Sequence, residues 1–297
     1  MAEIVGSLAM SHAPQLMLNP DQWGLLNTRS WDPLPVRPEF ESETLEVKWT
    51  KWKRCMAAID QLRKKIEALA PDTIVVVGDD QHENLVDDNM PPFTLFIGKE
   101  VEASTSLRYL NQPRTENRTR YKVDDALALS VLESLMEQGF DPSYSRKTRY
   151  DGGLGHAFAR VLKFLSPDAR YAILPVMVNT YYPPAPSAKR CLEFGKGLAS
   201  AIGAFSEKRR VVVVGSGGLS HTKIDEGLDA DFIRALTTND QKFLQRMESS
   251  ALVEGTSEIR NWIVTAAAAD RPATMIDYQP MYRTPNGVGC AMGFASW

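Results

Sequence analysis

The sequence contains four histidines, His12, His82, His156 and His221, and their positions suggest a shared chemical role. Three of them come directly after strand-like apolar runs, and His156 closes a glycine-rich turn before a helical pattern. A single histidine is most often a structural or surface residue. Four imidazoles at the ends of strands and turns are instead typical of a metal site or an acid–base site.

A carboxylate is needed to complete such a site, because the sequence has no Cys-x-x-Cys pair, no His-Glu-x-x-His motif and no EF-hand loop. Two neutral histidines and one carboxylate on one face of Fe(II) leave positions open for substrate and oxygen. Five acidic residues are candidates: Asp79, Asp80, Glu83, Asp151 and Glu258. Glu258 could equally complement the dipole of the helix that it begins, and Asp79 and Asp80 could simply form a turn.

The elements that must position these residues alternate between strands and helices. Continuous apolar runs predict strands at residues 4–10, 73–78, 94–97, 171–178 and 210–214. Apolar residues at helical spacing predict helices at residues 41–69, 124–138, 157–165 and 188–205, a mainly helical stretch up to 270, and then a loop-rich tail. This order predicts an α/β fold with a central, mostly parallel, buried sheet flanked by helices. Ligands of such sheets bind where loops leave the carboxyl ends of the strands.

Two loops are expected to shape the site within a single catalytic domain covering residues 1–297. A Pro-, Trp- and Asn-rich stretch at about residues 18–40 predicts a long loop insertion, and loops of that length are usually functional. The Gly-Ser-Gly-Gly run at residues 215–218 lacks a dinucleotide or P-loop pattern. We expect its glycines to let the backbone pass close to a ligand and to aim His221 inward.

Composition and charge restrict the partners of the chain. Its net charge of −3 gives no indication of nucleic acid or anionic membrane as a partner. No segment approaches the roughly 18 consecutive apolar residues that span a bilayer, and the first residues lack a signal-peptide pattern. The three cysteines, Cys55, Cys191 and Cys290, are far apart and indicate neither a disulfide framework nor a thiolate zinc site. A cytoplasmic protein is expected.

Four motifs, in order along the chain, resemble the class III (LigB-type) extradiol ring-cleavage dioxygenases, which include protocatechuate and gallate dioxygenases. Ser-His-Ala-Pro at residues 11–14 resembles the opening of that family, and Val-Gly-Asp-Asp-Gln-His-Glu-Asn at 77–84 resembles its second iron-histidine loop. Residues 215–221 resemble its catalytic-histidine loop, and residues 257–262 resemble the segment with its metal glutamate. The resemblance extends from residue 4 to about 265.

The resemblance implies a role for each of these residues. His12, His82 and Glu258 would ligate Fe(II), and His221 would take a proton from a substrate hydroxyl and later return one. His156 would hydrogen-bond the substrate or oxygen. The implied reaction inserts both atoms of O2 into a catechol-type, protocatechuate- or gallate-like ring and opens it, in aromatic compound catabolism.

Other functions use the same residues. A 2-aminophenol could replace the catechol, and the same ligands suit a zinc-dependent hydrolase or a non-catalytic binding protein on this fold. The side chains of Arg29, Arg37, Lys147 and Arg149 could pair with a substrate carboxylate, although a solvated surface role is more common. The resemblance further implies a homo-oligomer, with a separate small subunit as an alternative partner.

Overall fold

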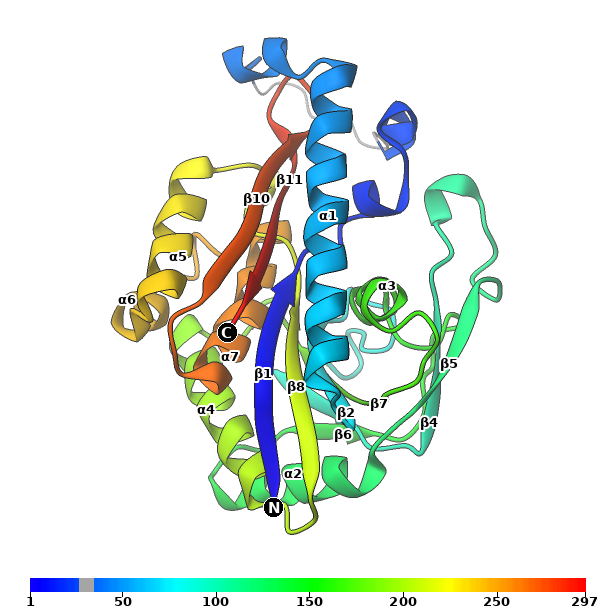
Figure 1. The fold of residues 1–297 in the computed structure, drawn as a ribbon, viewed down its shortest axis with the longest axis vertical. Helices are drawn as coiled ribbons and strands as arrows, with labels where there is room; N and C mark the ends of the chain where they lie inside the picture. The colour runs from blue at the N-terminus through cyan, green and yellow to red at the C-terminus, as the bar shows by residue number, and fades with distance from the viewer. Residues whose placement is uncertain (27–34) are drawn as a thin grey trace.

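The computed structural model describes residues 1–26 and 35–297, and a nine-stranded sheet forms its centre (Figure 1). Eight strands follow the order β10-β11-β1-β8-β2-β7-β3-β6, and β9 pairs with β11. Their bounds are β1 (Ala2–Met10), β2 (Thr73–Asp79), β3 (Phe93–Phe96), β6 (Ser143–Ser145), β7 (Ala172–Val178), β8 (Arg209–Ser216), β9 (His221–Lys223), β10 (Thr274–Tyr282) and β11 (Val288–Ser296).

The middle of the sheet is parallel and brings the candidate loops to one edge. Strand β8 pairs in parallel with β1 on one side and β2 on the other, and β2 pairs in parallel with β7. Met10 lies opposite Ser216, so the chain leaves β1 and β8 at the same level of the sheet. All seven residues of β2 are buried, as expected for a strand covered on both faces.

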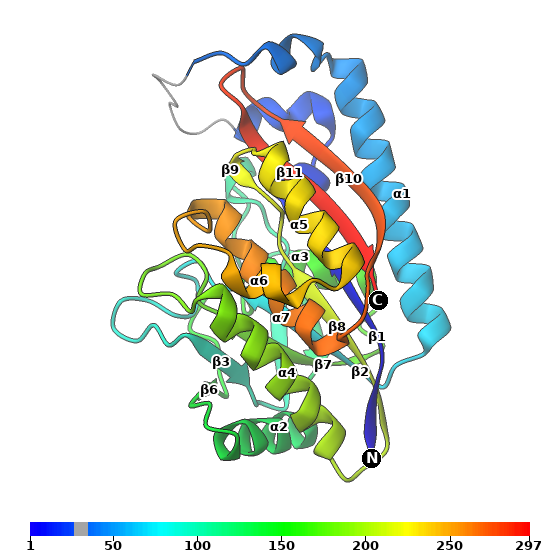
Figure 2. The same cartoon turned by 90° about the vertical axis from the view of Figure 1, so that its left-hand side faces the viewer.

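Helices cover both faces of the sheet, which gives three layers (Figures 1 and 2). Strand β2 shows the division, because Val76 packs in the cluster with Leu62 and Phe158 while Val75 packs with Leu198 and Trp262. The first face carries α1 (Leu45–Leu69) and α3 (His156–Leu165). The second carries α2 (Asp125–Glu137), α4 (Ala188–Ala204), α5 (Glu226–Thr238), α6 (Gln241–Arg246) and α7 (Ile259–Ala269). The predicted α/β class with a buried sheet flanked by helices is confirmed.

The prediction of a loop-rich tail is wrong, because β10 and β11 form an antiparallel hairpin that extends the sheet. Strand β11 is buried along its whole length, but four of its nine residues are glycine or alanine. Such small residues have low strand propensity, so the apolar pattern is weak. The antiparallel pairs of β11 with β1, β9 and β10, and of β3 with β7, also make the sheet mixed; the mostly parallel arrangement holds only for its centre.

Shorter elements frame the entrance to the carboxyl edge. The predicted insertion at about 18–40 contains the 3-10 helices η2 (Pro20–Leu26) and η3 (Pro38–Ser42), and its residues 27–34 lie outside the described part of the chain. The 3-10 helix η1 (Pro14–Met17) comes just before it. A hairpin of β4 (Glu100–Ser104) and β5 (Arg118–Lys122), joined through the 3-10 helix η4 (Arg108–Leu110), was not predicted. Within the described ranges, no helix is long and apolar enough to cross a membrane.

Candidate metal centre and active site

His12 follows β1 directly and is held by the end of β8. Its Nδ1 lies 2.9 Å from the Ser216 Oγ, and the Ser216 hydroxyl lies 2.6 Å from the Ala157 carbonyl oxygen. The hydroxyl proton therefore goes to the carbonyl, and the serine oxygen accepts a hydrogen bond from Nδ1–H of His12. This arrangement fixes the tautomer and leaves the Nε2 lone pair free to face the centre of the site.

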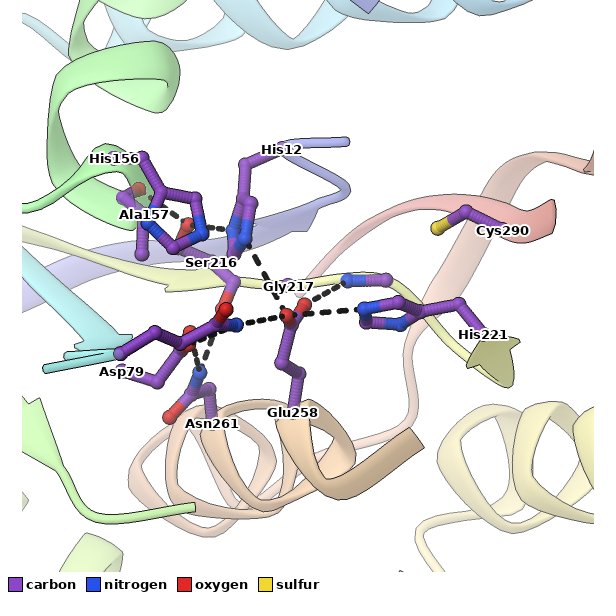
Figure 3. A network of polar contacts seen from close by, with 12 residues as sticks. His12, Asp79, His156, Ala157, Ser216, Gly217, His221, Glu258, Asn261 and Cys290 are labelled. Carbon is purple, nitrogen blue, oxygen red and sulfur yellow. Dashed lines mark hydrogen bonds and ion pairs between the residues drawn. The ribbon is translucent and has the colours of Figure 1, made fainter. Parts of the chain in front are cut away.

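Glu258 lies at the junction of the 3-10 helix η5 (Glu254–Glu258) and α7, and its carboxylate reaches between two histidines (Figure 3). Its Oε2 accepts a hydrogen bond of 2.9 Å from the Gly218 backbone N–H. Its Oε1 lies 3.5 Å from Nε2 of His12 and 3.2 Å from Nε2 of His221. Burial would raise the pKa of Glu258, but His221 and His12 lower it well below its usual value, so the carboxylate is ionised.

His221 begins β9, and the glycine-rich loop after β8 brings it to the same carboxylate. Its Nδ1 lies 3.3 Å from the Leu219 carbonyl oxygen, and its backbone N–H donates to the Thr256 hydroxyl at 3.1 Å. The ring packs so closely on Gly255 that a Cβ there would collide with it. Burial lowers the pKa of His221, but the Glu258 carboxylate and its hydrogen bond outweigh burial, and the net shift is upward.

Asp79 and His156 lie on the other side of His12. The possible ligand atoms of His12, Asp79 and His156 all lie within 4.8 Å of one another, and the His12 and His156 rings meet edge to face at 4.9 Å. His156 Nδ1 is 3.1 Å from both carboxylate oxygens of Glu83. Asp79 is fully buried, and this burial raises the pKa of its carboxyl group. Repulsion from the Glu258 carboxylate is a second, smaller cause of the same shift.

The donor set of this centre fits a divalent metal ion. Nitrogen and oxygen ligands at about 2.0–2.2 Å from an ion lie roughly 3.0–3.5 Å apart when they are neighbours around it. The separation of His12 Nε2 and Glu258 Oε1 is in that range. With Nδ1–H of His12 directed to Ser216, a neutral His12 presents its Nε2 lone pair toward Glu258 Oε1, and a metal cation between these two atoms would be bound by both.

His82 is turned away from this centre, whereas its neighbour Gln81 faces it. His82 has a positive φ of 59°, its ring stacks on Tyr182 at 3.6 Å, and its Nε2 lies 3.1 Å from the exposed Asp87 carboxylate. The Gln81 side-chain amide lies 3.3 Å from Glu258 Oε1 and 3.0 Å from Asp79 Oδ2. His82 still borders the cavity described next, and its role as a ligand stays a prediction.

The other acidic candidates have structural partners or lie at the surface. Asp80 accepts hydrogen bonds from the backbone N–H groups of residues 83–85, which is the turn-forming role considered for it. Glu83 holds His156, and Asp151 is exposed.

A cavity of about 410 Å³ opens above the centre, within the size range of small-molecule sites. His12, His82, His156, His221 and Glu258 all border it. Its wall also includes four arginines that the sequence analysis did not single out: Arg108, Arg114, Arg160 and Arg283. They come from four separate segments, and no local pattern marks them.

The arginine and lysine residues considered from sequence lie elsewhere. Arg37 donates to the Ile224 carbonyl oxygen at 2.7 Å, and Arg149 pairs with Asp88 at 3.2 Å. Lys147 borders a different hollow, beside β3 and β6, and Arg29 lies outside the described residues.

A family model described as the catalytic LigB subunit of aromatic ring-opening dioxygenase matches residues 38–287. The chain belongs to this LigB family. The resemblance inferred from the four motifs is therefore confirmed. The matched range begins after His12, so the first of those motifs lies outside it.

Individual relatives support the same family. A 2,3-dihydroxyphenylpropionate/2,3-dihydroxicinnamic acid 1,2-dioxygenase from Pseudomonas putida is 35% identical over 162 residues, covering 54% of this chain and 46% of that protein. The enzyme of that name from Cupriavidus necator is 32% identical over 161 residues, with the same coverage of both chains. The LigB-family chain thus spans about half the length of the curated relatives that it matches.

A solved structure supports the fold alone. The crystal structure of an uncharacterized protein from Escherichia coli K12 covers 98% of both chains with a TM-score of 0.57 and 15% sequence identity.

Proposed function

We propose that this protein is a metal-dependent extradiol dioxygenase that opens the ring of a catechol-type aromatic compound. The observation that carries the proposal is the meeting of His12 and His221 at Glu258 Oε1, on the wall of a 410 Å³ cavity. Family membership supports the reaction class, and the printed names of the curated relatives indicate aromatic diols as substrates.

His12 and Glu258 would hold the metal, with Fe(II) as the proposed ion. Imidazole and carboxylate donors suit Fe(II) and leave positions for small ligands. For the second loop we propose His82, which borders the cavity and would have to turn from its stack on Tyr182 to bind the ion. The neighbouring Gln81 side-chain N–H donates to Glu258 and would orient that carboxylate. A bound ion would bring the diol and molecular oxygen into contact and stabilise negative charge on the diol oxygens.

His221 would accept a proton from the substrate. Its Nδ1 is directed to a backbone carbonyl, so its Nε2 faces the cavity and Glu258. An imidazole suits proton transfer near neutral pH. His156 lies across the centre, held by Glu83, and would donate a hydrogen bond to the substrate or to oxygen.

Metal retention tests the ligand assignment without reference to turnover. Purified variants would be loaded with Fe(II) without oxygen, desalted and analysed for metal. We expect His12→Ala and Glu258→Ala to lose the ion and His221→Ala to keep it. His82→Ala should also lose the ion, whereas Gln81→Ala should bind it only somewhat more weakly, because Gln81 donates to Glu258. Full retention by His82→Ala would exclude His82 as the ligand of the second loop, and full retention by His12→Ala or Glu258→Ala would refute the site.

Oxygen uptake with a panel of catechols, gallates and 2-aminophenols tests the reaction. One O2 consumed per substrate, with a new absorbance band of a ring-opened product, is the expected result. His221→Ala should abolish uptake while the metal is retained. Stoichiometric iron without uptake on any substrate would contradict the proposed activity, and tightly held zinc with hydrolytic activity would indicate the hydrolase alternative. Oligomeric state, a small subunit and a cytoplasmic location stay predictions.

A further inference from the structure

The segment that carries His221 lies at the rim of the cavity, where it leaves the end of β8 and enters β9. His221 and Thr222 both border the cavity. Segments outside the central strands of a sheet are generally more mobile than the strands that they connect. A group that accepts a proton from a substrate must nevertheless keep one direction relative to it. The residues around His221 supply contacts that can fix this direction.

Ser220, the residue before His221, uses all of its hydrogen-bonding groups. Its N–H and its hydroxyl donate to the two carboxylate oxygens of Asp229 in α5, each at 2.7 Å, and the Tyr278 hydroxyl donates to the same carboxylate. The Ser220 Oγ accepts from the Asp225 N–H at 2.8 Å, and its carbonyl oxygen accepts from the Ala291 N–H at 2.9 Å. Ser220 and Asp229 are fully buried. Movement of Ser220 would therefore leave buried polar groups unpaired, which is costly.

Thr256 holds the backbone of His221 itself. Its hydroxyl oxygen accepts from the His221 N–H at 3.1 Å, and its hydroxyl proton goes to the His221 carbonyl oxygen at 3.2 Å. Thr256 is buried in η5, the same 3-10 helix that ends at Glu258. One short helix thus carries the Glu258 carboxylate and holds the backbone of His221. The His221 ring points toward that carboxylate, with Nε2 at 3.2 Å from Oε1 (Figure 3).

Thr222, the residue after His221, has a backbone conformation that its side chain disfavours. Its φ is 68°, in the left-handed region, where a residue with a branched β-carbon is a genuine outlier. The other non-glycine residues with positive φ in the described part of the chain are alanine, histidine, asparagine, glutamate or aspartate. The chain beyond Thr222 is tied to the C-terminal hairpin, because the Ile224 N–H donates to the Gly287 carbonyl oxygen at 3.1 Å. Such strain persists only where the surrounding structure over-determines the conformation.

We propose that Asp229 and Thr256 are positioning residues that clamp Ser220 and His221, hold Thr222 in its strained conformation and so keep the His221 ring directed at Glu258 and the cavity. The inference rests on the proposed function, in which His221 accepts a proton from the substrate. Neither residue touches the substrate; each acts through His221. Without the clamp, Thr222 relaxes to a negative φ, and the start of β9 carries the ring away from the reacting atoms.

A matched pair of substitutions at Thr256 tests the clamp in turnover. Valine keeps the shape of threonine without the hydroxyl, and serine keeps the hydroxyl. The probe is 3-(2,3-dihydroxyphenyl)propionate, the acid in the printed names of the curated relatives. Thr256→Val should lower kcat about tenfold to a hundredfold with little change in KM, because the ring direction affects proton transfer and not binding of the diol. Thr256→Ser should recover most of kcat, and both variants should retain metal as the parent protein does.

A second substitution at Thr222 tests the strain. Asparagine adopts a positive φ more readily than a β-branched residue does. Thr222→Asn alone should raise the midpoint of thermal unfolding by roughly 2 °C. Added to Thr256→Val, it should recover kcat about fivefold, because the native conformation then no longer opposes the preference of residue 222. Simple loss of packing at Thr256 would not be restored by a substitution at another position.

Amide hydrogen exchange over residues 215–224 of the metal-loaded protein tests the clamp without turnover. Thr256→Val removes the acceptor of the His221 N–H, and Asp229→Asn replaces an acceptor oxygen that faces two hydroxyl protons, so exchange should become faster in both. Thr256→Ser should exchange as the parent does. Thr238→Val is the control, because its hydroxyl donates to the Arg234 carbonyl oxygen at the exposed end of α5. It should change neither exchange nor kcat.

Unchanged exchange in both Thr256→Val and Asp229→Asn would overturn the inference, whatever the turnover. Loss of metal from Thr256→Val would overturn it as well, by indicating that Thr256 supports Glu258 and not His221. Failure of Thr222→Asn to restore any kcat would exclude the strain. The outcomes separate from those of the proposed function. Faster exchange in the clamp variants, with no turnover of any diol by the parent, would support the clamp and refute the dioxygenase activity. Turnover by the parent with unchanged kcat in Thr256→Val would do the reverse.

Discussion

Asp229 in α5 allows a quantitative prediction about the loop that carries His221. Its carboxylate is fully buried and accepts three hydrogen bonds of 2.7 Å, from the Ser220 N–H, the Ser220 hydroxyl and the Tyr278 hydroxyl. Burial raises the pKa of Asp229 to about 6, and the bonds from Ser220 and Tyr278 limit the rise. We therefore expect the stability of the protein to change with pH through this one group.

The size and sign of the effect follow from linkage. The pKa rises from 3.8 in the unfolded chain to about 6 in the folded protein, and each unit corresponds to about 1.4 kcal/mol, which gives about 3 kcal/mol in total. Between these two values the folded state keeps a proton that the unfolded state loses. The contribution of protonated Asp229 to the free energy of unfolding is therefore fully present below about pH 4 and is lost as the pH rises through 6.

Asp229→Asn removes this titration, so the free energies of unfolding of the parent and the variant should differ by a pH-dependent amount. Urea denaturation at pH 4.5 and 7.5 measures it. We expect the stability of the parent relative to the variant to fall by about 2 kcal/mol between these pH values, because about 1 kcal/mol of the total is already lost at pH 4.5. Asp231→Asn is a control on the same helix, because Asp231 forms an exposed pair with Arg234. A parent-to-variant difference that does not change with pH would refute the reasoning.

Three further predictions concern the packing around the centre. Ser216→Ala removes the acceptor of His12 Nδ1–H, so metal affinity measured by chelator competition should fall about 10- to 100-fold; unchanged affinity would contradict the tautomer assignment. Gly255→Ala should displace the His221 ring and reduce oxygen uptake while metal content is kept, and normal uptake would refute the close packing. Gly195→Ala places a methyl group against the Val264 carbonyl between α4 and α7, so thermal unfolding should show a loss of roughly 1–3 kcal/mol.

The sequence predicts the centre of the fold well because apolar continuity marks buried parallel strands. The run at residues 73–78 became β2. The site positions after β1 and after β8 were found because His12 and His221 follow apolar runs. The C-terminal hairpin was missed, since small residues interrupt the apolar side chains of β11, although the whole strand is buried. Burial of that kind depends on distant neighbours that a local pattern does not contain.

The second loop shows a further limit for the site. Gln81 and His82 are adjacent, and side-chain direction there depends on the backbone turn at His82, which has a positive φ. The turn directs the Gln81 amide to Glu258 and the His82 ring to Tyr182, an arrangement that residue type does not indicate, and the ligand role of His82 stays a prediction. The arginines of the cavity wall were also missed. Chain topology brings Arg108, Arg160 and Arg283 together, and their spacing in sequence gives no indication of it.

Strand β11 has a consequence for the order of events during biosynthesis. It lies between β10 and β1 in the sheet and also pairs with β9, with Phe294 opposite Met10 and Cys290 opposite His221, so it joins the strands beside both histidines. At translation rates of roughly 5–20 residues per second, β11 emerges about 15–60 s after β1. During that interval the segment with His12 lacks one of its neighbouring strands. We expect metal to be taken up only after β11 has been synthesised, because β11 joins the strands that carry the two histidines.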